Sequence, residues 1–181
     1  MLLPLILSSP TGDTTVSGLG IYNYMQSNSK LFGGEAGIHF HPKSIDWLHF
    51  ETTYATVIGK QENGDYLPFI PANKFKVEFR VETDQLSFLN NPYVWLNSTT
   101  AFDQNTAAPD ETVTAGYTLI DLSAGGNIKM KNQLIFIGIS ANNIFDVKYI
   151  DHLSTLKEVN LYNPGRNIAL TLKVPFGIKN N

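Results

Sequence analysis

The sequence contains one pair of side chains with the spacing of metal ligands, His39 and His41. Residues two apart in a strand point to the same face, so two imidazoles at this spacing could bind one metal ion. No cysteine or carboxylate stands beside the pair, and His49 and His152 lie in other segments. We therefore predict no metal site, and we interpret His39 and His41 as polar residues near a turn.

Carboxylates are the next candidates for chemistry, because a positioned carboxyl group can act as a general acid or base. The conspicuous ones are Glu51, Glu78, Glu82, Asp110, Glu111 and Asp121. None is paired with a serine or histidine at a catalytic spacing, and no nucleophile elbow is present. The glycine pairs at 33–34 and 125–126 lack the lysine and the spacing of a phosphate-binding loop. The sequence thus predicts that the protein is no enzyme and holds no cofactor.

Composition narrows the class of protein further. The formal net charge of −3 argues against a nucleic-acid partner, and the absence of cysteine excludes disulfides and thiol chemistry. No apolar run approaches the roughly 18 residues that a spanning helix needs. Charged residues make up only 16% of the chain, against roughly 25% in a typical soluble domain. A membrane protein built from strands is compatible with all of these features.

Alternation of apolar and polar residues with a period of two recurs along the chain and predicts β-strands. In residues 75–82, apolar side chains alternate strictly with Lys, Glu, Arg and Glu, and residues 167–176 alternate in the same way. We predict strands at roughly 1–9, 19–41, 46–60, 74–86, 92–103, 116–130, 132–149 and 166–176. Most of these exceed the ~5–6 residues of an ordinary strand and suit the ~9–11 residues of a tilted membrane strand.

The connections between these strands alternate in length. Short turns are predicted at 41–46, 89–92 and 130–132, and long segments at about 60–74, 104–116 and 150–165. Outer-membrane barrels have such short periplasmic turns and longer extracellular loops, with girdles of aromatic residues at the interfaces. Aromatic residues that we expect near strand ends are Tyr22, Tyr24, Phe32, Trp47, Tyr66, Tyr93, Trp95, Tyr117 and Tyr149. The predicted fold is all-β, an antiparallel up-and-down meander of about eight strands that forms a partial transmembrane β-barrel.

Several motifs near the C-terminus resemble those of a known family. The chain carries Asn142, Asn143, Phe145 and Asp146 in one segment, then Tyr149, and then Pro164, Gly165 and Arg166 before an alternating strand. This order resembles the end of a TonB-dependent outer-membrane receptor, and segments 31–37, 46–51 and 67–72 fit its successive strands and loops. The resemblance covers about residues 18–178.

The resemblance implies a place in a larger protein. Residues 1–181 are expected to be the C-terminal part of a 22-stranded barrel, whose plug and earlier strands lie outside this sequence. The expected location is the outer membrane of a Gram-negative cell, with membrane lipid as one partner. The expected activity is uptake of a metal chelate, such as a ferric siderophore or cobalamin, driven by the TonB complex acting through the plug.

The resemblance also gives roles to particular residues. The closing strand is expected to carry Ile168, Leu170, Leu172, Val174 and Phe176, of which Phe176 stands five residues before the end and corresponds to the aromatic insertion signal. Arg166 is expected to lock to a neighbouring carboxylate. In the loop 60–74, Tyr66 and Phe69 are expected either to grip a bulky ligand or simply to pack within the loop.

Two alternatives stay open at this stage. One is a complete eight-stranded outer-membrane barrel with a structural or adhesive role, which requires the first strand to pair with the last. The other is a soluble ligand-binding barrel, which requires its apolar face inside. The partial barrel instead predicts that the apolar rows 75–81 and 168–176 face outward to lipid, and that residues 1–9 and 166–176 form two unpaired sheet edges.

Overall fold

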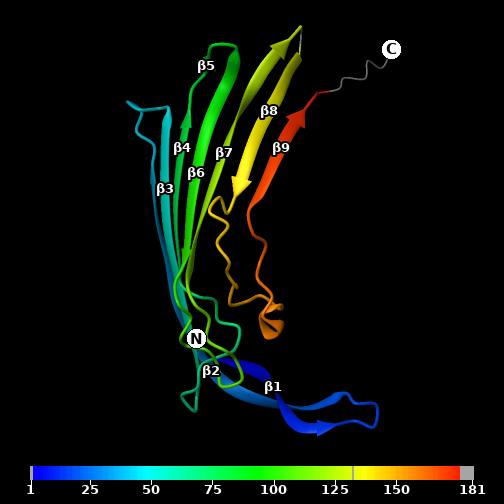
Figure 1. Ribbon diagram of the computed structural model, residues 1–181. Helices are drawn as coiled ribbons and strands as arrows, with labels where there is room; N and C mark the ends of the chain where they lie inside the picture. The colour runs from blue at the N-terminus through cyan, green and yellow to red at the C-terminus, as the bar shows by residue number, and fades with distance from the viewer. Residues whose placement is uncertain (1, 132, 176–181) are drawn as a thin grey trace, which may run out of the picture.

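The computed structural model describes residues 2–131 and 133–175 and shows one antiparallel sheet that forms a curved, open wall (Figure 1). Its strands are β1 (Leu2–Thr14), β2 (Gly20–Phe40), β3 (Leu48–Gln61), β4 (Lys74–Glu82), β5 (Gln85–Leu86), β6 (Leu89–Ala101), β7 (Tyr117–Met130), β8 (Gln133–Asn142) and β9 (Asn167–Lys173). The strand order is β1-β2-β3-β4-β6-β7-β8-β9, with the two-residue β5 pairing beside β6. The predicted antiparallel meander is confirmed.

The sheet does not close within the part of the chain that the structure describes. β1 pairs only with β2, and β9 pairs only with β8, so these two strands are the edges of the wall. β1 runs beside residues 20–30 of β2, whereas residues 29–40 of β2 pair with β3 on the other side. The predicted pair of free edges is confirmed, and the alternative of a closed eight-stranded barrel is wrong for these strands.

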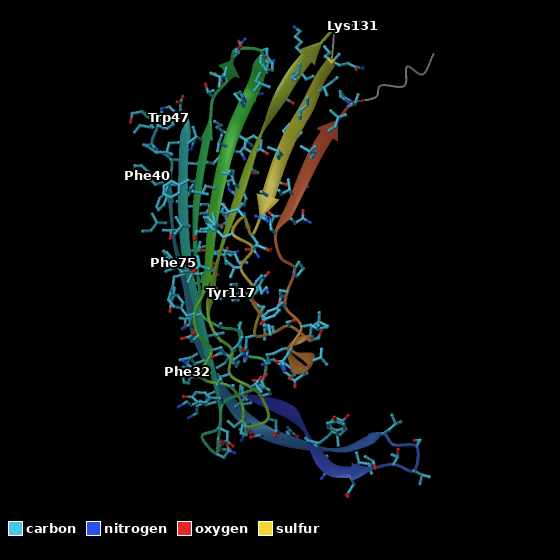
Figure 2. The ribbon with its side chains drawn as sticks, in the orientation of Figure 1. Phe32, Phe40, Trp47, Phe75, Tyr117 and Lys131 are labelled. Carbon is cyan, nitrogen blue, oxygen red and sulfur yellow. The ribbon has the colours of Figure 1, made fainter. Side chains whose placement is uncertain are left out.

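The strand register places apolar side chains in continuous rows on one face, here called the outer face. Directly opposed residues of antiparallel strands share a face. One such row runs through Phe40, Phe50, Phe79, Leu96, Leu122, Ala141 and Ile168. Figure 2 shows Phe32, Phe40 and Phe75 on the side of the wall away from the loop 143–166. As the alternation predicts, Phe79 and Leu170 are solvent-exposed.

Polar side chains occupy the opposite face, here called the inner face. A row directly across five strands consists of His39, Glu51, Glu78, Asn97 and Asp121. The loop 143–166 packs on this face, where its Asp151 accepts hydrogen bonds from Lys74 and Tyr117. An apolar outside and a polar inside are the arrangement of a membrane barrel and the reverse of a soluble one. The soluble-barrel alternative is therefore wrong.

Hydrophobic burial is concentrated in the loops rather than in the sheet. Among the described residues, the buried apolar side chains are Leu67, Ile70, Ala101 and Ala108. All but Ala101, the last residue of β6, lie in the connections β3–β4 and β6–β7. No helix in residues 2–131 and 133–175 is long and apolar enough to cross a membrane.

Several predicted boundaries need correction. The strand predicted at 132–149 ends at Asn142, because Asn143 and Asp146 adopt left-handed backbone conformations (φ 50° and 55°) that a strand cannot contain. The turn predicted at 89–92 lies inside β6, and the real reversal falls at 83–88 around β5. The closing strand ends at Lys173, so Val174 lies beyond it, and Phe176 lies outside the described residues.

The predicted aromatic girdles are also only partly correct. Four of these aromatics contact inner-face groups. Tyr93 lies under Arg80, and Trp95 donates to Glu78. Tyr117 donates to Asp151, and the Tyr149 ring lies against Tyr117 in a tilted arrangement. Trp47 and Phe32, by contrast, are exposed near opposite ends of the wall (Figure 2). Closeness to a strand end does not decide which face a side chain occupies, since successive side chains alternate between faces.

Candidate ligand-binding loops and their support on the inner face

Three long connections leave the same end of the wall: residues 62–73 after β3, 102–116 after β6 and 143–166 after β8 (Figure 1). We call them together the loop assembly. The first folds back onto its own strand, where the Leu67 N–H donates to the Gly59 carbonyl at 3.0 Å. A Cβ at Gly59 would stand 2.7 Å from Leu67 Cδ1 and 3.0 Å from Leu67 Cβ, so this close return favours glycine.

Gln104 joins the first two loops. Its buried side-chain amide donates to the carbonyls of Ile70 (2.8 Å) and Pro71 (3.1 Å). The amide oxygen of Gln104 accepts from the backbone N–H and the hydroxyl of Thr106. Buried carbonyls of an irregular loop need such partners, because water does not reach them. Gln104 therefore fixes loop 62–73 against loop 102–116.

Glu111 makes a second link between the same loops. One oxygen of its carboxylate accepts from the Phe69 N–H at 2.9 Å, and the other accepts from the Ala108 N–H at 3.3 Å. Phe69 has a left-handed backbone (φ 59°), and its side chain is 76% exposed. A non-glycine residue in this conformation is costly and is retained only where its surroundings hold it. The assembly thus presents an aromatic ring to solvent from a backbone that Glu111 holds in place.

The two aromatics predicted to grip a ligand have different surroundings. The Tyr66 ring is half-buried and lies 5.1 Å from the Lys60 ammonium, whereas Phe69 projects freely. Contact of either ring with a ligand stays a prediction.

His152 joins the third loop to the second. Its imidazole is almost completely buried, with Nδ1 2.8 Å from the Thr114 hydroxyl and 3.5 Å from the Lys157 ammonium. The same ammonium donates to the Thr112 carbonyl at 3.1 Å. Nε2 of His152 has no hydrogen-bond partner and points toward Glu111, whose nearest oxygen is 3.7 Å away.

Asp151 ties the third loop to the wall. Its carboxylate accepts from the Lys74 ammonium at 3.0 Å and from the Tyr117 hydroxyl at 2.7 Å. Burial by itself would raise the pKa of Asp151, but the hydrogen bonds from Tyr117 and Lys74 outweigh burial and hold the pKa below its usual value. Tyr149 lies over Tyr117 with ring centroids 4.4 Å apart. Asp151 is therefore a charged anchor for the loop.

The motif residues 142–166 form the base of this loop. Asn143 is buried, its side chain closes a turn by two hydrogen bonds with the Val147 backbone, and its N–H donates to Asp121 at 2.8 Å. Asp146 accepts from the Arg166 N–H at 2.8 Å. A Cβ at Gly165 would stand 2.6 Å from the same Asp146 oxygen. The two ends of the loop therefore meet at Asp146.

The remaining motif residues have minor contacts. Asn142 ends β8 opposite Asn167, and Phe145 and Pro164 are exposed. The expected lock between Arg166 and a carboxylate forms through the backbone N–H, whereas the guanidinium lies 3.5 Å from the Ile144 carbonyl. Arg166 therefore does contact a neighbouring carboxylate, that of Asp146, and its backbone makes this contact.

At the other end of the wall, the structure brings together the rings of His39, His41 and His49. The sequence did not predict this grouping. The His49 ring lies 3.9 Å from that of His41, which is 6.4 Å from that of His39. A cavity of about 230 Å³ beside them is lined by His39, His49, Glu51, Glu78, Arg80 and Trp95. Within the described ranges, no three or more His, Asp or Glu side chains are arranged to hold a metal ion.

The comparisons with known proteins identify the family. Residues 5–144 match the family model described as TonB dependent receptor-like, beta-barrel. The chain belongs to this family. TonB-dependent receptors are outer-membrane proteins, and in barrels of this kind an apolar outer face meets lipid while a polar inner face lines the lumen. No match is found among curated proteins.

A solved structure supports the same fold over a longer stretch. The structure named Copper transporter OprC is similar with a TM-score of 0.79 at 17% sequence identity. The similarity covers 97% of this chain and 27% of the transporter, so the chain spans about a quarter of that protein's length. Residues 145–175, which lie beyond the family match, therefore also largely share the receptor-like fold.

Proposed function

We propose that the chain supplies part of the barrel wall and extracellular loops of a receptor that imports a metal chelate across the outer membrane. The observation that carries the proposal is the loop assembly, which is tied to the inner face through Asp151 and presents the exposed ring of Phe69. Family membership and the similarity to a protein named as a copper transporter support transport of a metal-containing ligand.

The proposal assigns no catalytic step to these residues. Its partners are lipid on the outer face, a small metal chelate at the loops, and the TonB complex. Candidate cargoes are a ferric siderophore, cobalamin and a copper complex. Each is bulky or metal-bearing, and an exposed aromatic ring offers apolar contact area to such a ligand.

Metal uptake by cells that carry the full-length receptor tests the proposal. Cells with and without the receptor are supplied with each chelate, and cell-associated metal is measured with and without a proton-motive force. Receptor-dependent, energy-dependent accumulation of one chelate is expected. Accumulation of none of them, or accumulation that is unaffected by collapse of the proton-motive force, would contradict the proposal.

Phe69→Ala tests the loop contact. If Phe69 is an anchor of the bound chelate, the variant should weaken binding by about 1–2 kcal/mol, or roughly five- to thirtyfold in Kd. Phe145→Ala is the matched control, because Phe145 is a comparably exposed aromatic in the third loop. Equal affinity of the wild type and Phe69→Ala would remove Phe69 from the site.

A further inference from the structure

Three charged or titratable side chains meet inside the loop assembly, away from solvent. Glu111 comes from loop 102–116, and His152 and Lys157 come from loop 143–166, with Lys157 in the short 3₁₀ helix η1 (Lys157–Val159). Through the Glu111–Phe69 hydrogen bond, the group also reaches loop 62–73. We call Glu111, His152 and Lys157 the clasp.

The neighbours of His152 determine which protonation state fits the clasp. Nδ1 of His152 lies 2.8 Å from the Thr114 hydroxyl and 3.5 Å from the Lys157 ammonium, which has donors only. An unprotonated Nδ1 can accept from both groups, so this tautomer fits the contacts. The remaining proton then sits on Nε2, which points toward Glu111. The neutral imidazole is thus the form that the closed assembly accommodates.

A second proton on His152 would disturb this arrangement. It would bind at Nδ1, where the N–H could donate to the Thr114 hydroxyl at 2.8 Å but the positive charge would face the Lys157 ammonium 3.5 Å away, inside a buried site. Glu111 offers partial compensation from 3.7 Å. The other nearby carboxylate, Asp151, is committed to Lys74 and Tyr117.

We propose that the clasp is a proton-sensitive latch, which keeps the three loops closed while His152 is neutral and releases them when His152 is protonated. The inference does not depend on the identity of the cargo. Release would expose the lumenal face beneath the loops to mildly acidic medium.

The direction of the pH effect follows from burial. Burial lowers the pKa of His152 below its usual value, and Lys157 lowers it further, while Glu111 and Asp151 oppose this. Opened loops expose His152 and return its pKa to about 6.5. The open form therefore binds the proton more tightly, and the closed form loses stability as the pH falls below about 6.5. One proton changes the opening equilibrium by at most about tenfold per pH unit.

Hydrogen–deuterium exchange of the full-length receptor in detergent measures this opening. Labelling times are scaled to the intrinsic exchange rate at each pH between 5.0 and 7.5. Protection of residues 62–73, 104–116 and 150–161 should decrease by up to about tenfold per pH unit below 6.5, with β6 and β7 unchanged. Equal protection of the loops at pH 5.5 and 7.5 would overturn the proposal.

Variants distinguish a latch controlled by His152 from a nonspecific destabilisation of the loops at low pH. His152→Gln should abolish the pH dependence even if it changes the protection at neutral pH. Lys157→Met should weaken the dependence, because the repelling ammonium is gone, whereas Glu111→Gln should strengthen it, because the compensating carboxylate is gone. His49→Gln, at the opposite end of the wall, should behave as wild type. A pH effect that survives in His152→Gln would refute the latch.

Discussion

At the scale of single residues, the structure shows how short polar side chains hold a long loop. Asn143 and Asp146 adopt left-handed conformations, which Asn and Asp tolerate better than other residues with a Cβ. Their side chains then bond the backbone at Val147 and Arg166. Loop 143–166 is therefore closed at its base by local geometry, and Asp151 is free to dock on the wall.

Gly165→Ala tests this closure. The new methyl group would lie 2.6 Å from Oδ1 of Asp146, the oxygen that accepts a hydrogen bond from the Arg166 N–H. The carboxylate has to move away from the methyl group, and this movement weakens the hydrogen bond. We expect a loss of about 0.5–1.5 kcal/mol in local stability, the usual net contribution of one hydrogen bond, because Asp146 and Arg166 are both exposed. Increased exchange of residues 143–166 in the full-length receptor would report it.

Asp146→Ala in the same background is the control. With the carboxylate already removed, the added methyl group meets no oxygen, so the double variant should be less destabilised than the sum of the two single variants. Additive effects would show that Gly165 and Asp146 are not coupled.

At the scale of elements, the parity of residues along each strand decides which environment a side chain meets. Leu122 and Ser123 are neighbours on β7, yet Leu122 belongs to the outer apolar row and Ser123 opposes Trp95 on the inner face. A single-residue shift of the strand register would exchange the two faces.

Arginine at these two positions measures the difference between the faces. Leu122→Arg places a charge in the lipid-facing band, where a cost of up to about 2–4 kcal/mol is expected near the bilayer midplane. Ser123→Arg places the same charge on the hydrated side and should cost much less. Urea unfolding of the receptor in lipid vesicles compares the two, and equal destabilisation would argue against the assigned faces.

At the scale of the whole molecule, the wall has two edges whose backbone groups lack strand partners among the described residues. One edge consists of the free side of β1 and, beyond the end of β1, residues 31–40 of β2. The other edge is the free side of β9. Each unpaired backbone group costs several kcal/mol in hydrocarbon, so such edges must be covered in a membrane.

Residues 1–181 expressed alone should therefore aggregate, whereas the full-length receptor should be monodisperse. Light scattering after size-exclusion chromatography in detergent compares the two. A monodisperse monomer of residues 1–181, with cysteines in β1 and β9 that crosslink to each other, would show instead that these strands close by themselves.

The sequence by itself determined the fold class, the antiparallel order and the outward apolar rows. These features are local: alternation with a period of two fixes which residues share a face, and short turns join neighbouring strands. The ends of elements were less well determined, as at Asn143, because a left-handed turn residue interrupts a pattern that still looks strand-like.

Only the tertiary structure decided the loop contacts. Glu111 and His152 stand 41 positions apart in the sequence, and nothing near either residue indicates the other. The sheet brings their loops to one end of the wall, and burial there turns an isolated histidine, a lysine and a glutamate into one coupled group. Which polar groups face one another in a loop depends on the packing of distant segments, and no periodic pattern in the chain encodes that packing.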